Sequence, residues 1–224
     1  MTKTQKPLLA IDPGPTRSGF CFVEETSWQA NWNPADGPQP RIPSKFTTGT
    51  MVNGLIVQSL IVPNMQSDFD NADLIIEGMV SYGMPIGRDV LDTAVWIGRF
   101  ETYAITAVPD RRIRPYIEQI TRPAVKLELC NNRTAKDTNV RQAIIDIYGG
   151  DEKALRGVKC PECRGQGWRG RGRPPCDACA DPQRPGEHGT GYLVPPGPLV
   201  GVASHGWSAL ALAVTFYRIA SRDW

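Results

Sequence analysis

Two carboxylates in this sequence close short apolar runs and could take part in chemistry. Asp12 follows the run Leu8–Ile11, and Glu77 closes a second run that begins at Asp73. A carboxylate at the end of a buried strand is costly to desolvate unless a positive charge pairs with it, and a divalent cation is a common partner. Because Asp12 precedes a Pro-Gly pair, a turn-forming role is the alternative for this residue. The two carboxylates are therefore candidate metal ligands.

The six cysteines are unevenly placed, and four of them form two Cys-x-x-Cys pairs. The pairs are Cys160 with Cys163 and Cys176 with Cys179. Two such pairs joined by a short arm can bring four thiolates into the tetrahedral site that Zn²⁺ occupies in closed structural sites. The spacing favours zinc, with disulfides or an iron–sulfur centre as the alternatives. Cys21 and Cys130 stand alone in apolar contexts and are expected to be buried thiols.

Basic residues and one tryptophan lie between the two cysteine pairs. They are Arg164, Trp168, Arg169, Arg171 and Arg173. Arginine side chains bind phosphates and an indole ring can stack on a base, so this arm is a candidate DNA contact. A loop whose charges only keep the protein in solution would have the same composition.

A sheet must hold the two carboxylates, and the order of apolar runs predicts one. Residues 8–12 and 20–23 are expected to form a β-hairpin, and residues 73–77 a further buried strand. Residues 112–121 are predicted to be an edge strand because they include Pro115. Helices are predicted at 51–62, from an N-cap at Asp89 to about 104, at 123–129, from Asp137 to 147 and at 204–218, with a long loop at 27–44. This order indicates an α/β fold with a mixed sheet.

The composition excludes several classes of protein. The chain has 224 residues, of which 41% are hydrophobic, and this is enough for one good core with an insertion. No apolar run approaches the length of a membrane span and no signal-peptide core follows the N-terminus, so a cytoplasmic protein is expected. The net charge of +2 is nearly neutral, so local clusters must bind any anionic partner.

Four stretches, taken in order, are similar to one family of nucleases. They are residues 11–16 (IDPGPT), 75–77 (IIE), 129–143 (LCNNRTAKDTNVRQA) and 205–211 (HGWSALA). Together they resemble the RuvC-like Holliday junction resolvases of the ribonuclease-H-like superfamily, in particular the members carried by phages. The resemblance implies a mixed five-stranded sheet flanked by helices. The cytoplasm of a bacterial host cell is then the expected location.

We predict that the chain divides into three parts, because glycine, proline, arginine and cysteine dominate the composition between residues 157 and 198. Residues 1–156 are expected to form the first part of the ribonuclease-H-like core. Residues 157–198 are expected to form the zinc-ribbon insertion, and residues 199–224 the closing helix of the core.

The resemblance also implies an activity, the metal-dependent nicking of Holliday junctions or other branched DNA with two Mg²⁺ or Mn²⁺ ions. One ion would lower the pKa of the attacking water and the other would stabilise the leaving 3′ oxygen. Asp12 would bridge both ions and Glu77 would complete one coordination sphere. The family's closing helix usually carries aspartates where this chain has His205 and Ser208. The histidine can still bind a metal or orient the water, whereas the serine could only hold a metal-bound water.

The departure at Ser208 leaves two other functions open. One is a protein of the same fold that binds branched DNA without cutting it. The other is an adaptor that uses the zinc arm to bind protein. Both DNA-binding functions predict a steep dependence of DNA affinity on salt, and the adaptor does not.

The resemblance further implies where DNA is bound. Basic residues of this family contact DNA in the region of Lys126, Arg133, Lys136 and Arg141, and Tyr82, in the loop after Glu77, could wedge against an unpaired base. A solvated helix face and core packing are the respective alternatives. Because a resolvase makes paired, symmetric cuts, a twofold homodimer is also implied.

Overall fold

The computed structural model describes residues 6–29, 31–66, 72–80, 83, 86–109, 115–156, 158–159, 192–194 and 197–222. The chain divides into two compact units, one formed by Met1–Ile144 with Val202–Trp224 and the other by Ile145–Gly201. The predicted insertion at 157–198 lies within the sequence of the second unit, and its boundaries stay a prediction. Outside the described residues lie the four predicted zinc ligands and six predicted DNA contacts: Cys160, Cys163, Cys176, Cys179, Tyr82, Arg164, Trp168, Arg169, Arg171 and Arg173.

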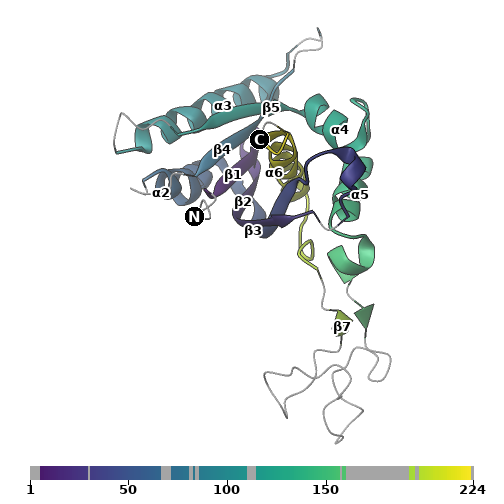
Figure 1. Ribbon diagram of the computed structural model, residues 1–224. Helices are drawn as coiled ribbons and strands as arrows, with labels where there is room; N and C mark the ends of the chain where they lie inside the picture. The colour runs from purple at the N-terminus through teal and green to yellow at the C-terminus, as the bar shows by residue number, and fades with distance from the viewer. Residues whose placement is uncertain are drawn as a thin grey trace, which may run out of the picture. The chain divides into compact units, whose positions relative to one another are not determined.

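A five-stranded mixed sheet with the strand order β3-β2-β1-β4-β5 forms the centre of the first unit (Figure 1). The strands are β1 (Leu8–Asp12), β2 (Arg17–Trp28), β3 (Arg41–Val52), β4 (Asp73–Gly78) and β5 (Ile117–Thr121). Strand β2 is antiparallel to both of its neighbours, β1 and β3, whereas β4 is parallel to β1 and β5 is parallel to β4. The predicted mixed five-stranded α/β fold and the edge position of β5 are confirmed.

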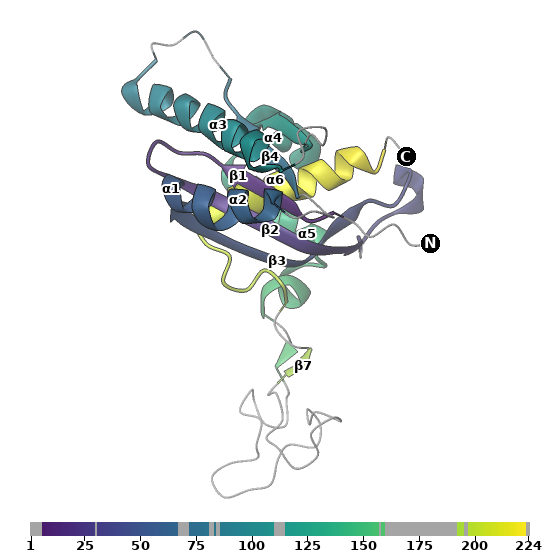
Figure 2. The ribbon, with the colours of Figure 1, turned by 90° about the vertical axis from the view of Figure 1, so that its left-hand side faces the viewer.

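Helices cover both faces of this sheet. On one face, α1 (Asn53–Ile56), the π-helical turn η2 (Val57–Ile61) and α2 (Val62–Met65) form a continuous helical segment that packs with α3 (Arg88–Ala107), as Figure 2 shows. On the other face, α6 (His205–Ala220) packs across β1, β2 and β3, and α4 (Arg122–Cys130) contacts it. The chain then continues from α4 into α5 (Asp137–Ile147). Of the helices described, none combines the length and the apolar character that a membrane span needs.

The remaining elements are short. A 3₁₀ turn, η1 (Pro34–Asp36), lies between β2 and β3. In the second unit, the π-helical turn η3 (Glu152–Arg156) is followed by β6 (Val158–Lys159), which pairs antiparallel with β7 (Tyr192–Val194).

The alternation of side chains along the strands decides which face receives the two carboxylates. Ile11 of β1 and Ile76 of β4 are buried in the core beneath α3. Successive side chains of a strand point to opposite faces of the sheet. Asp12 and Glu77, each one residue later, therefore lie on the face that α6 covers.

Three local predictions are wrong. Residues 41–52 form β3, although the sequence pattern predicts a loop up to residue 44 and a helix from residue 51. The helical segment continues through Pro63 to Met65, because Pro63 follows a π-helical turn and stands in the first turn of α2, where a missing N–H is tolerated. The N-cap of α3 is Gly87, so Asp89 lies inside the helix.

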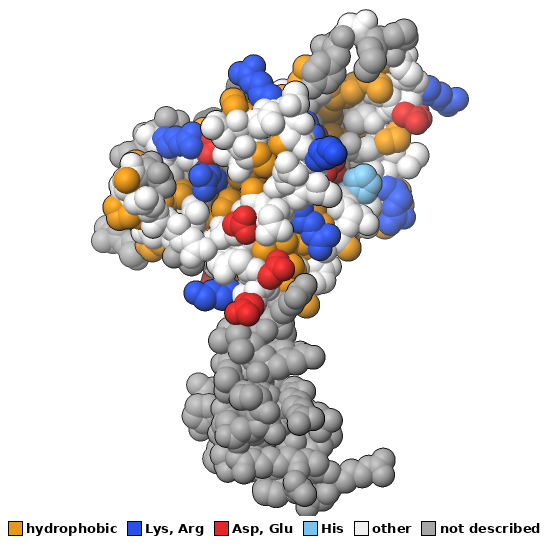
Figure 3. Space-filling model, turned by 90° about the vertical axis from the view of Figure 1, so that its right-hand side faces the viewer, with side chains coloured by type: hydrophobic (Ala, Val, Ile, Leu, Met, Phe, Trp, Pro, Cys, Tyr) orange, Lys and Arg blue, Asp and Glu red, His pale blue; other side chains and the backbone are white. Residues whose placement is uncertain are grey.

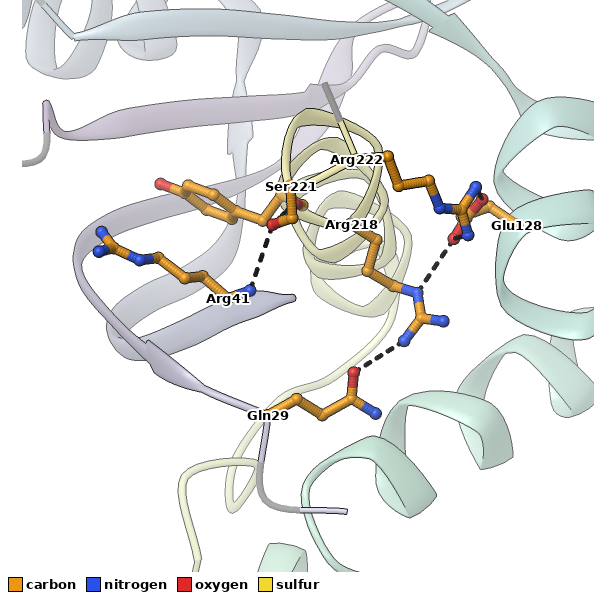
Figure 4. Close-up of polar contacts among 7 residues, drawn as sticks. Gln29, Arg41, Glu128, Arg218, Ser221 and Arg222 are labelled. Carbon is orange, nitrogen blue, oxygen red and sulfur yellow. Dashed lines mark hydrogen bonds and ion pairs between the residues drawn. The ribbon is translucent and has the colours of Figure 1, made fainter. Parts of the chain in front are cut away.

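A polar cluster fixes the C-terminal end of α6 (Figure 4). Glu128 of α4 accepts hydrogen bonds from Arg218 Nε at 3.1 Å and Arg222 Nη2 at 2.8 Å. Arg218 also donates to Gln29 Oε1 at 2.9 Å, just after β2. Because the Glu128 side chain is largely shielded from solvent, these ion pairs are screened less than surface pairs. The cluster ties α4 and the end of β2 to the helix whose other end begins at His205.

Candidate functional site

Asp12 and Glu77 end two neighbouring parallel strands at the same edge of the sheet. Ile11 pairs with Ile76 in the β1–β4 register, which places Asp12 beside Glu77. Their side chains are only 15% and 16% exposed. Two carboxylates are thus held side by side and largely away from water, as the sequence predicted.

The start of α6 brings His205 and Ser208 to Asp12. His205 Nδ1 lies 3.1 Å from Asp12 Oδ2, and the Ser208 side chain, one turn later, also hydrogen-bonds to the Asp12 carboxylate. The imidazole is otherwise exposed, so its second nitrogen is open to solvent. The fold therefore brings together the four predicted catalytic residues Asp12, Glu77, His205 and Ser208.

Arg122 holds Glu77, and sequence reasoning did not identify it. Arg122 Nη1 lies 3.1 Å from Glu77 Oε2, and Nη2 of the same guanidinium lies 2.9 Å from Asp137 Oδ1. Lys126 Nζ is 3.2 Å from the same oxygen of Asp137. Its position in the chain could have identified it. Arg122 directly follows β5, which is parallel to β4 and ends at the same edge of the sheet as Glu77.

The electrostatics of this cluster favour an added positive charge. Burial, and next the neighbouring Asp12 carboxylate, raise the pKa of Glu77 to about 7, although Arg122 acts against this rise. Burial also raises the pKa of Asp12, more than His205, Arg122 and Ser208 together lower it. At Asp137 the balance is reversed: burial raises its pKa, but Arg122 and Lys126 outweigh this effect and the pKa is lowered. Asp12 and Glu77 are therefore the carboxylates whose charge is poorly compensated.

The donor set suits one hard divalent cation. Oxygen ligands are those that Mg²⁺ prefers, and an imidazole nitrogen is compatible with Mn²⁺ as well. Among the residues that the structure describes, however, no three His, Cys, Asp or Glu side chains are gathered closely enough to hold a metal ion. Asp12 contacts His205, whereas Glu77 is paired with Arg122. A cation at Asp12 would therefore recruit Glu77 only through a local rearrangement of its side chain.

The turn after Asp12 is fixed by two buried polar side chains, Ser18 and Asn53. The Ser18 hydroxyl donates to Asn53 Oδ1 at 2.7 Å, and Asn53 Nδ2 donates to the Gly14 carbonyl at 2.9 Å. The Gly14 N–H in turn donates to Ser18 Oγ at 3.1 Å. This closed set of hydrogen bonds preorganises the backbone that carries Asp12. The pattern of the sequence gave no signal for Asn53, because its partner lies 35 residues away.

Strand β2 approaches the start of α6 very closely at Gly19. Gly19 is opposite Asp12 in the sheet, and a Cβ added there would lie 2.4 Å from the His205 carbonyl oxygen and 2.6 Å from His205 Cβ. On the other side of His205, Ser204 has φ +43°, a conformation that costs a non-glycine residue energy. The position of His205 thus depends on a glycine beneath it and on a strained residue before it.

Replacing Gly19 by alanine is expected to displace the first turn of α6 and to destabilise the protein by about 1–3 kcal/mol, the usual cost of overpacking. The measurements are the midpoint of thermal unfolding and the NMR chemical shifts of the His205 imidazole. Gly54→Ala is the matched control, because a Cβ at Gly54 meets no atom within 4 Å. Equal effects of the two substitutions would contradict the close approach at Gly19.

The four described residues predicted to contact DNA lie in α4, in α5 and between them. Arg133, Lys136 and Arg141 are exposed, and the Arg141 guanidinium lies 4.6 Å from the centre of the Trp207 ring. Lys126 is half-buried against Asp137. Figure 3 shows Lys and Arg side chains around a histidine on this side of the molecule. Three of the four residues therefore present charge at the surface, and Lys126 belongs to the charge network around Glu77.

A pocket of about 250 Å³ adjoins Glu77 and Arg122. Its lining consists of Pro13, Glu77, Gly78, Met79, Val80, Thr93, Arg122 and Pro123. Most of the wall is apolar, and the Glu77 carboxylate and the Arg122 guanidinium supply its charged groups.

Comparisons with protein-family models and with curated protein sequences found no match. Among solved structures, a T. thermophilus RuvC in complex with Holliday junction substrate matches with a TM-score of 0.51 and 13% identity, covering 98% of this chain and 97% of that chain. A Thermus thermophilus RuvC structure matches with a TM-score of 0.49 and 14% identity, covering 96% and 97%. At such identities the likeness shows the fold alone. The chain has a RuvC-like, ribonuclease-H-like fold.

Proposed function

We propose that this chain is a metal-dependent endonuclease that nicks Holliday junctions or other branched DNA. The observation that carries the proposal is the contact of His205 with Asp12, beside Glu77, at the carboxyl ends of parallel strands. The fold supports it, because a RuvC with the same fold has been seen with Holliday junction substrate. The exposed basic residues Arg133 and Lys136 support binding to a phosphate backbone.

The described side chains divide the work of phosphodiester hydrolysis. Asp12 and Glu77 would hold Mg²⁺ or Mn²⁺, which when bound lowers the pKa of water and stabilises charge on the reacting phosphate. Asp12 holds one ring nitrogen of His205, so the other nitrogen can accept a proton from an attacking water. Ser208 hydrogen-bonds to the Asp12 carboxylate and orients it.

The proposal extends to the cysteine segment. Cys160, Cys163, Cys176 and Cys179 would bind a structural Zn²⁺ in a ribbon inserted into the core. Tyr82 and the arm residues Arg164, Trp168, Arg169, Arg171 and Arg173 would add contacts to DNA. The stretches 11–16, 75–77, 129–143 and 205–211, which resemble those of phage-carried resolvases, support an origin in a phage.

A twofold homodimer would present two such sites to a four-way junction. One surface of α3 supports this assembly, because Leu91, Val95 and Ile105 are 55%, 51% and 57% exposed. Their spacing places them on one side of the helix, where Gly98 and Thr102 continue the row with small side chains. An apolar row of this kind, repeated on a second copy, makes a self-complementary interface.

Val95→Glu is expected to convert the dimer into monomers, because the substitution buries an unpaired charge in that interface. Sedimentation equilibrium measures the mass, and a cruciform plasmid reports whether the two strands are cut together. Glu24→Gln, at an exposed position of strand β2, is the control. A dimer that survives Val95→Glu would place the interface elsewhere.

The experiment that tests the function compares a labelled four-way junction with a linear duplex of the same sequence, each with Mg²⁺, Mn²⁺ or a chelator. Paired nicks in the junction alone, lost with the chelator, are the expected result. The salt dependence of binding, measured in parallel, distinguishes a DNA-binding protein from an adaptor.

A second function, the binding of branched DNA without cleavage, is favoured by one observation. Glu77 is already paired with Arg122, and Ser208 stands where the related helix usually carries an aspartate. Tight, salt-dependent binding of the junction with no nick under any metal condition would establish this function and overturn the nuclease proposal.

A further inference from the structure

The pairing of Glu77 with a guanidinium bears on how many cations the site holds. The resemblance to the RuvC-like resolvases implies two divalent cations in the site, and two such ions need several carboxylates as ligands. The described site has Asp12 and Glu77, with Asp137 linked to Glu77 through Arg122. Ser208 is neutral and hydrogen-bonded to Asp12. Ligands for a second cation are therefore scarce.

We propose that Arg122 supplies the positive charge that a second cation would otherwise supply, and that each chain binds a single divalent cation, at Asp12 and Glu77. This inference rests on the proposed function, since it concerns the same site. It concerns the number of bound ions, and that number can be measured without cleavage.

The geometry of Arg122 supports this assignment. The two terminal nitrogens of its guanidinium contact two different carboxylates, Glu77 at 3.1 Å and Asp137 at 2.9 Å. A metal ion that bridges two carboxylates would likewise lie between them and contact an oxygen of each. Because Arg122 is the first residue of α4 and follows β5 directly, the backbone places it at the edge of the sheet where Asp12 and Glu77 lie. An arginine cannot be deprotonated in this environment, so its charge is permanent.

The balance of charge points the same way. When ionised, the three carboxylates Asp12, Glu77 and Asp137 face two fixed cations, Arg122 and Lys126, which leaves one negative charge. One divalent cation makes the cluster singly positive, which matches the single negative charge of a phosphodiester. Two divalent cations would leave three positive charges around one phosphate. Arg122 and one metal ion therefore suffice.

The experiment counts tightly bound Mn²⁺ by electron paramagnetic resonance, on full-length protein whose cysteines are loaded with Zn²⁺. Wild type is expected to bind about one Mn²⁺ per chain. Arg122→Gln removes the ion-pair partner of Glu77 and leaves Asp137 with Lys126 alone, so it is expected to raise the number to about two, while Arg122→Lys keeps it at one. Lys126→Gln is the matched control, because it removes a neighbouring charge that contacts Asp137 but not Glu77, and it is expected to leave the number at one. Circular dichroism confirms that each variant is folded.

Two bound ions in wild type, or one in a folded Arg122→Gln variant, would overturn the inference and leave the nuclease proposal intact. No tight Mn²⁺ in any of the four proteins would overturn both, because the proposed function needs a cation at Asp12.

Discussion

Asp12→Asn is expected to lower the rate of junction nicking by about three orders of magnitude while the affinity for the junction stays unchanged. The substitution removes one charge with almost no change in volume. A metal ion contributes several kcal/mol of charge stabilisation in the transition state, and each 1.36 kcal/mol is a factor of ten in rate. The variant also removes the charged partner that holds His205. In the proposed function, junction binding is expected to depend on exposed cations such as Arg133 and Lys136, which the substitution leaves unchanged.

Single-turnover nicking at saturating protein, together with the dissociation constant from gel shift, separates the two effects. Asp73→Asn is the matched control. Asp73 begins the strand that Glu77 closes, and burial raises its pKa as well, but it lies at the opposite end of β4. Nicking at the wild-type rate by Asp12→Asn would remove this carboxylate from the mechanism. A loss of rate in both variants would indicate a general requirement for buried charge.

The fold could be predicted well wherever apolar runs were short and bounded by turns. Strands β1 and β4 and helix α6 were predicted at nearly their observed positions, because their buried faces are continuous in sequence. Strand β2 was predicted at 20–23 and extends in both directions to Arg17–Trp28. Strand β3 was missed because its residues alternate weakly: Pro43, Gly49 and three threonines weaken the pattern. Its strand character comes from pairing with β2 along its whole length, which is tertiary information.

The candidate site could be predicted in part. Asp12 and Glu77 were found because each closes an apolar run, and His205 and Ser208 because the helix they begin resembles a known motif. Arg122 was missed, since an arginine before a proline at the start of a helix has no distinguishing pattern. Its role arises from the parallel register of β4 and β5, which brings the residue after Thr121 to Glu77. The pairing of charges from distant segments is therefore the feature of the site that local sequence patterns do not predict.

Glu77→Gln is expected to stabilise the metal-free protein at pH 7.5, by on the order of 3 kcal/mol, and this gain is expected to vanish towards pH 5. Burial and the adjacent Asp12 raise the pKa of Glu77 from 4.5 to about 7 in the folded state. Between these two values the folded state binds more protons than the unfolded state, so the free energy of unfolding of wild type falls as the pH rises. The shift, at 1.36 kcal/mol for each pKa unit, sets the size of the loss. Glutamine is neutral throughout and does not show this loss.

Thermal unfolding of wild type and Glu77→Gln between pH 5 and 8, with a chelator present, measures the effect. Glu24→Gln is the control, because Glu24 forms an exposed ion pair with Lys45 and the loss of this pair is expected to change the stability little at any pH.

Addition of Mn²⁺ at pH 7.5 is expected to raise the unfolding temperature of wild type more than that of Glu77→Gln, since a bound cation compensates the buried negative charge that only wild type carries at Glu77. A stability difference between wild type and Glu77→Gln that does not change with pH would show that Glu77 is already fully compensated by Arg122. In that case the Glu77 carboxylate would position Arg122 and would not be a metal ligand.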